Sequence, residues 1–302
     1  MTTSLKFPGP VVIGGLGGSG TRVIAEIMQH INFYMGSDLN SANDNLWFSL
    51  LFKRSKWYIK NSKKKESEIF KALRIFRDIM HGFLGSKVGD FQFIFRAAIE
   101  CSICGIHFGG LGKSGRGLWP FKRVYRMIRA KKLNSEHIGW GWKEPNTHIY
   151  IKYLNEYFDD LKYIHTIRNG LDMAYSRNQA QLHTWGQILN IKSQDNSTPL
   201  PKIALEYWIK ANENVLAYGK EMSRDRFLMI NFEELCYNPR RVINTLLDFL
   251  EQDIDHINLD KLIDLVKVPL STGRYKKQDL SIFSNDEIDT VRKFGFSIDV
   301  ER

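Results

Sequence analysis

Near its N-terminus the chain reads Val11-Val12-Ile13-Gly14-Gly15-Leu16-Gly17-Gly18-Ser19-Gly20-Thr21-Arg22. The apolar run at 11–13 predicts a buried strand, and apolar residues at helical spacing from Val23 to Ile31 predict a helix. The glycines between them allow a tight turn, whose backbone N–H groups can face an anion at the start of the helix. This stretch therefore predicts a strand, a phosphate-binding glycine loop (residues 14–22) and a helix.

The glycine loop differs at one position from that of the nucleoside-triphosphate hydrolases, which reads G-x-x-x-x-G-K-[ST]. Gly15 and Gly20 have the required spacing, but Thr21 replaces the lysine that contacts the β- and γ-phosphates. The hydroxyls of Ser19 and Thr21 and the charge of Arg22 remain as phosphate ligands. We therefore expect the loop to bind a phosphate group without hydrolysing ATP.

Beyond the glycine loop, apolar runs and helical stripes alternate along the chain. Strands are expected at 138–142, 161–167 and 227–231, with helices between them, including one over 171–183. This alternation predicts an α/β fold, a P-loop-type parallel sheet flanked by helices, in one domain over residues 1–302. Residues 50–135 show helical patterns without strands, so we expect them to form a helical insertion.

Composition excludes several classes of protein. With 43% hydrophobic and 25% charged residues, the 302-residue chain is typical of globular proteins and not of disordered, collagenous or coiled-coil ones. No stretch approaches the roughly 18 apolar residues of a membrane helix, and the N-terminus lacks the features of a signal peptide. Cys101 and Cys104 form one C-x-x-C pair, which without a second pair favours core packing over zinc. We expect a cytoplasmic protein without a metal site.

Positive charge is concentrated in the middle of the chain. Residues 53–132 contain 20 Lys and Arg against 5 Asp and Glu, a local net charge of +15, whereas the remainder of the chain carries −5. Such a field favours an anionic partner, which could be an acidic substrate, a polyanion or a membrane surface. A solvated face is the alternative, and it is the favoured interpretation for the lysine run at 63–65.

The glycine loop, with its S-G-T-R sequence, resembles the 5′-phosphosulfate loop of the sulfotransferases that use 3′-phosphoadenosine 5′-phosphosulfate (PAPS). A second block, Leu161–Ser176, resembles the family's strand, its R-N-P-x-D sequence and the serine eight residues after the arginine, with Gly170 in place of proline. In the family the arginine and serine bind the 3′-phosphate of PAPS, which implies this role for Arg168 and Ser176. Arg168 also follows a strand, where α/β sheets bind their ligands.

Two further blocks extend the resemblance to residues 11–296, with only the basic middle segment unmatched. Residues 227–250 are similar to the family's strand, acidic pair and helix. Ser271–Lys276 resembles the G-R-[WY] segment of bacterial members, whose arginine and backbone cover the 3′-phosphate. The resemblance implies that the donor is bound by Gly17, Gly18, Ser19, Gly20, Thr21, Arg22, Arg168, Ser176, Gly273 and Arg274.

The catalytic groups also follow from the resemblance. Sulfuryl transfer builds negative charge on the leaving phosphate, so cations are expected beside it, with Arg22 as one of them. Residues 141–145 resemble the family's K-[TDE]-P at a strand end, which makes Lys143 the candidate for a second cation. A surface lysine at the end of a strand is the alternative.

A base must accept the proton of the acceptor. Cytosolic eukaryotic members use a histidine two residues after the lysine, but here Pro145 stands in that position. Other members use a carboxylate after the first helix, where Asp44 is our first candidate and Asp38 our second. Either could instead be only a helix N-cap. His148, near Lys143, is the third candidate.

We therefore expect a sulfotransferase that moves a sulfuryl group from PAPS to a hydroxyl or amine and releases 3′,5′-ADP. The insertion at 50–135 is expected to cover the acceptor, and its charge favours an anionic carbohydrate, lipid or small metabolite. Contact with a membrane surface stays open, and nucleic acid is not expected. The alternatives are a P-loop kinase acting on a small molecule and a non-catalytic polyanion-binding protein. Thr21 and the Arg168–Ser176 block argue against the kinase.

Overall fold

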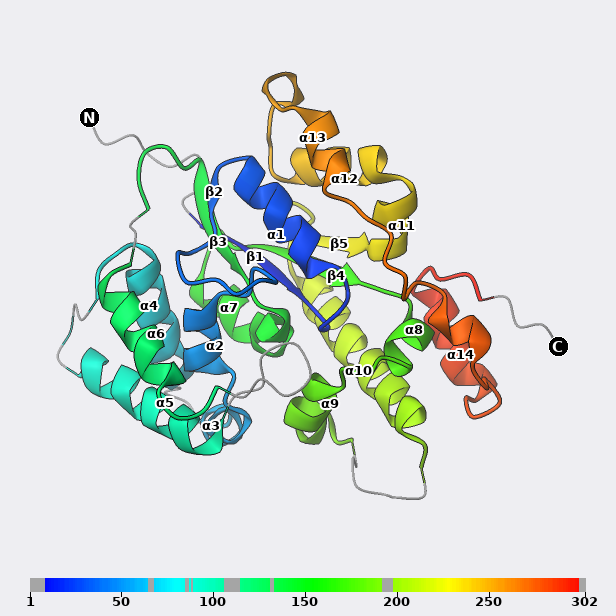
Figure 1. The fold of residues 1–302 in the computed structure, drawn as a ribbon, viewed down its shortest axis with the longest axis horizontal. Coiled ribbons are helices and arrows are strands. Elements are labelled where there is room, and N and C mark those ends of the chain that lie inside the picture. Colours follow the sequence, from blue (N-terminus) through cyan, green and yellow to red (C-terminus); the bar gives the residue numbers. More distant parts are fainter. Residues whose placement is uncertain are drawn as a thin grey trace.

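The computed structural model describes residues 9–64, 68–84, 87, 89–105, 115–130, 133–191 and 198–298. At its centre lies a parallel sheet with the strand order β2-β3-β1-β4-β5. Helices cover both of its faces (Figure 1). The strands are β1 (Pro10–Gly15), β2 (Phe33–Tyr34), β3 (Gly139–Lys143), β4 (Lys162–Ile167) and β5 (Phe227–Asn231). The predicted α/β class is confirmed.

The central strand is buried on both faces, so its alternate residues enter two separate cores. Val11 and Ile13 pack with α1 (Thr21–His30), α11 (Phe232–Tyr237), α12 (Pro239–Phe249) and α13 (Leu259–Asp264). Val12 points into the larger core on the other face. That core includes α7 (Ile151–Tyr157), α10 (Leu200–Glu221) and five fully buried tryptophans, Trp47, Trp140, Trp142, Trp185 and Trp208.

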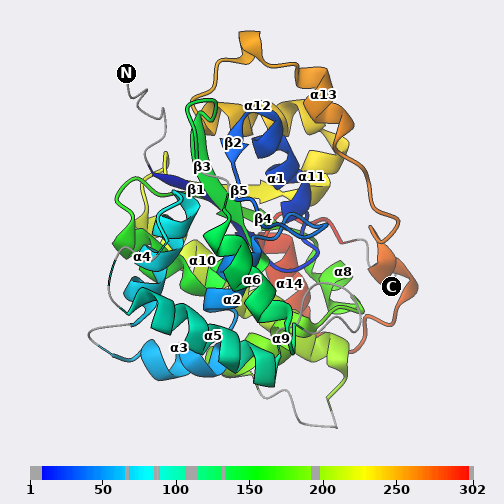
Figure 2. The same cartoon turned by 60° about the vertical axis from the view of Figure 1, so that its left-hand side comes forward.

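The segment between β2 and β3 is helical, as predicted. It consists of α2 (Leu46–Phe52), α3 (Ser55–Asn61), α4 (Glu68–Met80), α5 (Asp90–Cys104) and α6 (Trp119–Ile128). Figure 2 brings this layer of helices forward. Lys63 and Lys64 are exposed, as expected for a solvated face, and Lys65 lies outside the described residues. Cys101 is buried in α5 but Cys104 is exposed, so core packing explains only the first cysteine.

One predicted helix is divided in two. Residues 171–183 form α8 (Gly170–Ala174) and α9 (Ala180–Trp185), so the prediction of one continuous helix was wrong. The side chain of Asn169 accepts two N–H groups at the start of α8. The amide of Gln179 donates to the carbonyls of Met173, Ala174 and Ser176 and so ends it. Hydrogen bonds from side chain to backbone compete with the helix, and hydrophobic periodicity does not detect them.

Among the described residues, the remaining elements are four short 3-10 helices and one α-helix near the C-terminus. They are η1 (Pro145–Tyr150), η2 (Gly186–Leu189), η3 (Ile254–His256), η4 (Arg274–Lys277) and α14 (Asn285–Lys293). Across the described part of the chain, no helix combines the length and the apolar character that a membrane crossing requires.

Candidate active site

A cavity of about 360 Å³ opens at the carboxyl-terminal ends of the strands. Gly15 ends β1, Lys143 ends β3, and Arg168 follows β4. The chain leaves β1 toward β2 and β3 on one side and later returns to β4 on the other. In parallel sheets, ligands bind at this kind of switch point. The fold therefore brings three separate sequence blocks to one cavity.

The glycine loop has the backbone conformation that its composition predicted. Gly18 and Gly20 have φ angles of +101° and +92°, in the left-handed region. Gly20 also needs the absence of a side chain, because an added Cβ would lie 2.0 Å from the ring of Phe232. Helix α1 begins directly afterwards at Thr21 and has no acidic residue in its first turn. The cavity thus faces a helix N-terminus suited to an anion.

The side chains of the glycine loop point in different directions. Thr21 lines the cavity, whereas the buried hydroxyl of Ser19 lies 2.9 Å from that of Thr166 in β4. Arg22 lies at the edge of the cavity with its side chain 64% exposed, and its Nε is 3.6 Å from a carboxylate oxygen of Glu26. Ser19 therefore braces the loop against the sheet, and Arg22 keeps freedom to move.

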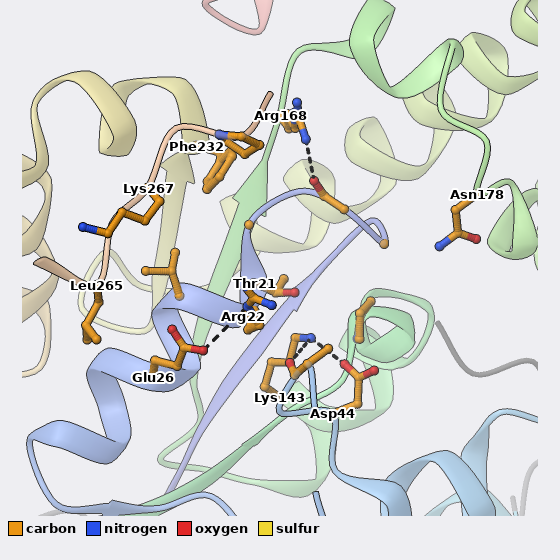
Figure 3. Close-up of a pocket in the computed structure, with 17 residues that line it drawn as sticks. Thr21, Arg22, Glu26, Asp44, Lys143, Arg168, Asn178, Phe232, Leu265 and Lys267 are labelled. Atoms are coloured by element: carbon orange, nitrogen blue, oxygen red, sulfur yellow. Dashed lines mark hydrogen bonds and ion pairs between the residues drawn. The ribbon is translucent and has the colours of Figure 1, made fainter. Parts of the chain in front are cut away.

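Lys143 and Asp44 form a buried ion pair in the wall of the cavity (Figure 3). The Nζ of Lys143 lies 2.5 Å from Oδ1 of Asp44 and 3.0 Å from the carbonyl oxygen of Ala42. The other oxygen of Asp44 accepts a hydrogen bond of 2.8 Å from the amide of Asn40. The two side chains are only 3% and 11% exposed. Lys143 is therefore not a surface lysine.

The structure separates the three candidate bases. Asp44 is not a helix cap, because the side chain of Asn45 accepts the N–H groups of Trp47 and Phe48 at the start of α2. Asp44 lines the cavity, whereas Asp38 and His148 do not.

Asp38 and His148 are fully buried and occupied by other contacts. The carboxylate of Asp38 accepts hydrogen bonds from Arg123 at 3.0 Å and Arg126 at 2.7 Å, which tie α6 to the segment between β2 and α2. The two ring nitrogens of His148 lie 2.7 Å from the Pro145 carbonyl and 3.3 Å from the Tyr207 hydroxyl. Burial lowers the pKa of His148 to about 4.

Arg168 connects the glycine loop to the C-terminal segment. Its buried guanidinium donates to the carbonyl of Gly18 at 3.3 Å and to the hydroxyl of Ser271 at 3.0 Å. Asp172 in α8 lies 3.5 Å from the guanidinium and accepts the N–H of Gly273 at 2.8 Å. The contacts of Asp172 thus place the predicted G-R-Y segment beside Arg168.

A second arginine lies in the same region. The Nε of Arg274 donates to the carbonyl of Ser271 at 3.1 Å. Burial and the charge of Arg168 lower the pKa of Arg274. The Nε of Arg168 is buried without a hydrogen-bond partner among the residues that the structure describes, and a carboxylate oxygen of Glu233 lies 3.9 Å from it. The two neighbouring guanidinium groups, one of them with an unused donor, form a surface suited to a phosphate.

Ser176 lies outside any helix, two residues after the end of α8. Its hydroxyl accepts the N–H of Asn178 at 3.2 Å, and Asn178, not Ser176, lines the cavity. The eight-residue spacing from Arg168 thus crosses the end of a helix, which the sequence pattern did not indicate.

Sequence reasoning missed a chain of hydrogen bonds beside the cavity. The side-chain oxygen of Gln181 accepts the N–H of Gly17 at 2.6 Å, and its amide donates to Asn146 at 3.1 Å. Asn146 in turn donates from its backbone N–H to Glu144 at 2.7 Å. Gln181 and Gly17 are 164 residues apart, so no local signal could have indicated this contact.

Because two histidines are buried, we expect the fold to become less stable as the pH falls. Burial lowers the pKa of both His148 and His165 to about 4, whereas an unfolded histidine titrates near 6.5. Between these values the unfolded chain binds the extra protons, so the free energy of unfolding falls as the pH drops. We expect each histidine to account for about 2 kcal/mol of the loss between about pH 7.5 and pH 5.

Urea denaturation at the two pH values measures this loss, and His165→Gln provides the comparison. Glutamine does not titrate and can still bond to Asn212, which lies 2.8 Å from the ring of His165. The variant should show a correspondingly smaller pH dependence. An unchanged dependence would show that His165 contributes none of it.

A sequence model with the description "Sulfotransferase family" matches residues 10–256. Among solved structures, the sulfotransferase domain from the Synechococcus PCC 7002 olefin synthase is similar, with 16% identity, a TM-score of 0.47 and 99% of each chain covered.

Two further solved structures are similar at the same level. The sulfotransferase domain from the curacin biosynthetic pathway has 15% identity and a TM-score of 0.48, over 97% of this chain and 99% of that one. Sulfotransferase STF9 from Mycobacterium avium has 13% identity and a TM-score of 0.43, over 98% and 78%. The search of curated proteins gave no match.

Proposed function

The chain belongs to the sulfotransferase family, and from this premise we propose that it transfers a sulfuryl group from PAPS to a hydroxyl or amine. One observation carries the proposal. A single cavity is lined by the glycine loop, by the Lys143–Asp44 pair and by Arg168, which come from three distant parts of the chain. These supply an anion cradle, a cation beside a carboxylate, and a second anion site.

The two anionic ends of PAPS match two parts of the cavity. The backbone N–H groups of the glycine loop and of the first turn of α1 would hold the 5′-phosphosulfate, with Thr21 and Arg22. Arg168 and Arg274 would hold the 3′-phosphate, which would give the buried Nε of Arg168 a partner. Phe232 offers an aromatic wall between these parts for the adenine. Ser176 and Gly273 belong to the same proposed binding set.

The residues of the ion pair divide the chemistry between them. The acceptor oxygen or nitrogen forms a bond to sulfur while the bond from sulfur to the phosphate oxygen breaks, and the electron pair of that bond leaves with 3′,5′-ADP. Lys143 stabilises the charge that develops on the transferring group. The carboxylate of Asp44 accepts the proton that the acceptor loses. The buried wall holds both side chains in place and keeps bulk water from weakening their interactions.

The acceptor would enter from the side of Asp44. A small polar pocket there is lined by Asp44, Lys53, Glu144, Asn146, Asn178 and Gln181. Burial raises the pKa of Glu144, and Lys53 lies 3.9 Å from this carboxylate. Amides and charged groups suit a polar acceptor with several hydrogen-bonding groups. The helical insertion would cover this side as a lid.

A thermal-shift titration tests the proposal against its alternatives. A ligand that binds only the folded state raises the unfolding temperature according to its affinity. We expect a rise with 3′,5′-ADP and none with ATP·Mg²⁺ or heparin. A rise with ATP·Mg²⁺ alone would indicate a kinase, and a rise with heparin alone would indicate a polyanion-binding protein.

The role of Arg168 can be tested with two nucleotides that differ by one phosphate. We expect Arg168→Ala to weaken 3′,5′-ADP binding by about 10- to 150-fold, because a charge-assisted hydrogen bond contributes roughly 1.5–3 kcal/mol. Adenosine 5′-phosphosulfate lacks the 3′-phosphate and should lose much less. Calorimetric titration of both ligands measures the difference, and Lys220→Ala, at an exposed lysine of α10 that does not line the cavity, is the control. Equal losses for both ligands would rule out this role.

A further inference from the structure

Helix α5 exposes a row of large apolar side chains. Phe91, Phe95, Ile99 and Ile103 are spaced by four residues, so they follow one side of the helix. They are 44%, 45%, 50% and 72% exposed. The opposite side of α5 is buried in the larger core. A surface helix normally turns polar residues outward, so the packing of the residues that the structure describes does not explain this second apolar side.

Helix α6 extends the apolar row into a wider face. The backbones of Ser102 and Gly117 are hydrogen-bonded, which places Leu118 at the same end of the helix pair as Ile103. Leu118 is 73% exposed, and farther along α6 Tyr125 and Ile128 are also exposed. Both helices bury their other sides in the same core, so these residues all point away from it. We name this surface the α5–α6 face.

The α5–α6 face is rich in cations and has no free carboxylate among the described residues. Arg96, Arg116, Lys122 and Arg129 are exposed on it, whereas Arg126, also exposed, is paired with the buried Asp38. The two carboxylates of α5 are engaged, because Asp90 lies 2.5 Å from Arg74 and Glu100 lies 2.7 Å from Arg54. Residues 115–130 contain no acidic residue. Apolar side chains beside exposed arginines are the composition of a surface that binds an anionic interface.

We propose that the α5–α6 face docks the protein on the surface of an anionic phospholipid bilayer. Phe91, Phe95, Ile99, Ile103 and Leu118 would enter the boundary between headgroups and acyl chains, and the arginines would contact lipid phosphates. Charge complementarity favours the anionic bilayer over a second copy of the chain. In a dimer through this face, the cations of the two copies would lie close together and repel each other. Helices α5 and α6 lie at the opposite end of the molecule from α14 (Figure 1).

Co-sedimentation with vesicles tests both parts of the proposal. We expect the protein to bind vesicles of phosphatidylcholine and phosphatidylglycerol in equal parts, and to bind pure phosphatidylcholine weakly. The double variant Phe95→Ser/Ile99→Ser should bind the vesicles at least about tenfold more weakly, because it removes the apolar anchor. The double variant Arg96→Ala/Arg129→Ala should lose affinity for the anionic vesicles only, by about fivefold for each arginine removed.

Matched controls lie on the far side of the domain. Tyr237→Ser removes an aromatic side chain that is 64% exposed, and Lys293→Ala removes an exposed cation of α14. Neither should change binding. All the substituted side chains are exposed, so the unfolding temperature should stay within a few degrees of the parent protein.

Three results would overturn the proposal. The first is a failure of the parent protein to bind the anionic vesicles. The second is vesicle binding that the Phe95→Ser/Ile99→Ser variant retains in full. The third is a dimer in light scattering that this variant converts to a monomer without vesicle binding by the parent, which would make the face a contact between copies. The proposal does not depend on the transfer reaction, because vesicle binding is measured without donor or acceptor.

Discussion

Asp44→Asn is expected to lower kcat by about 10²–10⁴-fold, the usual contribution of a positioned general base. Asparagine keeps the shape of the side chain and can still contact Lys143 and Asn40, but it cannot accept the proton of the acceptor. Binding of 3′,5′-ADP should change little, because a carboxylate makes no favourable contact with a phosphate. Steady-state kinetics with PAPS and a hydroxyl or amine acceptor measure kcat, and calorimetry measures the affinity for 3′,5′-ADP.

A matched carboxylate variant separates a lost base from a general effect of removing a carboxylate. Asp248→Asn is the matched control, since Asp248 is an exposed carboxylate of α12 that does not line the cavity. It should keep kcat close to the parent value. If Asp44→Asn also keeps the parent kcat, another group accepts the proton, and Glu144 in the adjoining pocket would be the next to test.

Lys143→Ala should lower kcat by about 10²–10³-fold, the range found when one donor to developing charge is removed. The loss should appear in kcat and in kcat/KM alike, because the interaction strengthens in the transition state. Lys143→Arg retains the charge but places it differently, so it should recover only part of the activity. A change in KM alone would mean that Lys143 holds the donor and not the transition state.

Because Lys143 and Asp44 are 2.5 Å apart, we expect the effects of their substitutions on activity to be non-additive. Each side chain neutralises the other in a buried wall, so each single variant also leaves an uncompensated charge or dipole. The double variant Asp44→Asn/Lys143→Ala should therefore lose less activity than the product of the single losses. Fully multiplicative losses would show that the two groups act independently.

Local patterns were sufficient for much of this protein. The apolar run at 11–13 and the glycines after it predicted β1, the loop and α1, because these features depend on neighbouring residues. The strands at 162–167 and 227–231 and the helical insertion were predicted for the same reason. The sulfotransferase resemblance, drawn from four short blocks, is confirmed by the match of the family over residues 10–256.

Other features depend on residues that are far apart in the chain. Asp38 and Asp44 lie in one segment and have the same chemistry, so the sequence could only rank them. The fold distinguishes them, because Arg123 and Arg126 of α6 occupy Asp38 while Lys143 meets Asp44 across 99 residues. The break between α8 and α9 also could not be predicted from local patterns, since it depends on the hydrogen bonds that the side chain of Gln179 makes to the end of α8.

Periodicity thus predicted the fold class, and short motifs indicated the family by resemblance and named some of the residues that line the cavity. Only the tertiary structure placed Lys143 on Asp44, Arg274 beside Arg168, and the apolar side of α5 at the surface. The physical reason is that burial and pairing set the chemistry of a charged or apolar side chain. Both are properties of the neighbours that folding brings together, and the order of residues along the chain does not specify them.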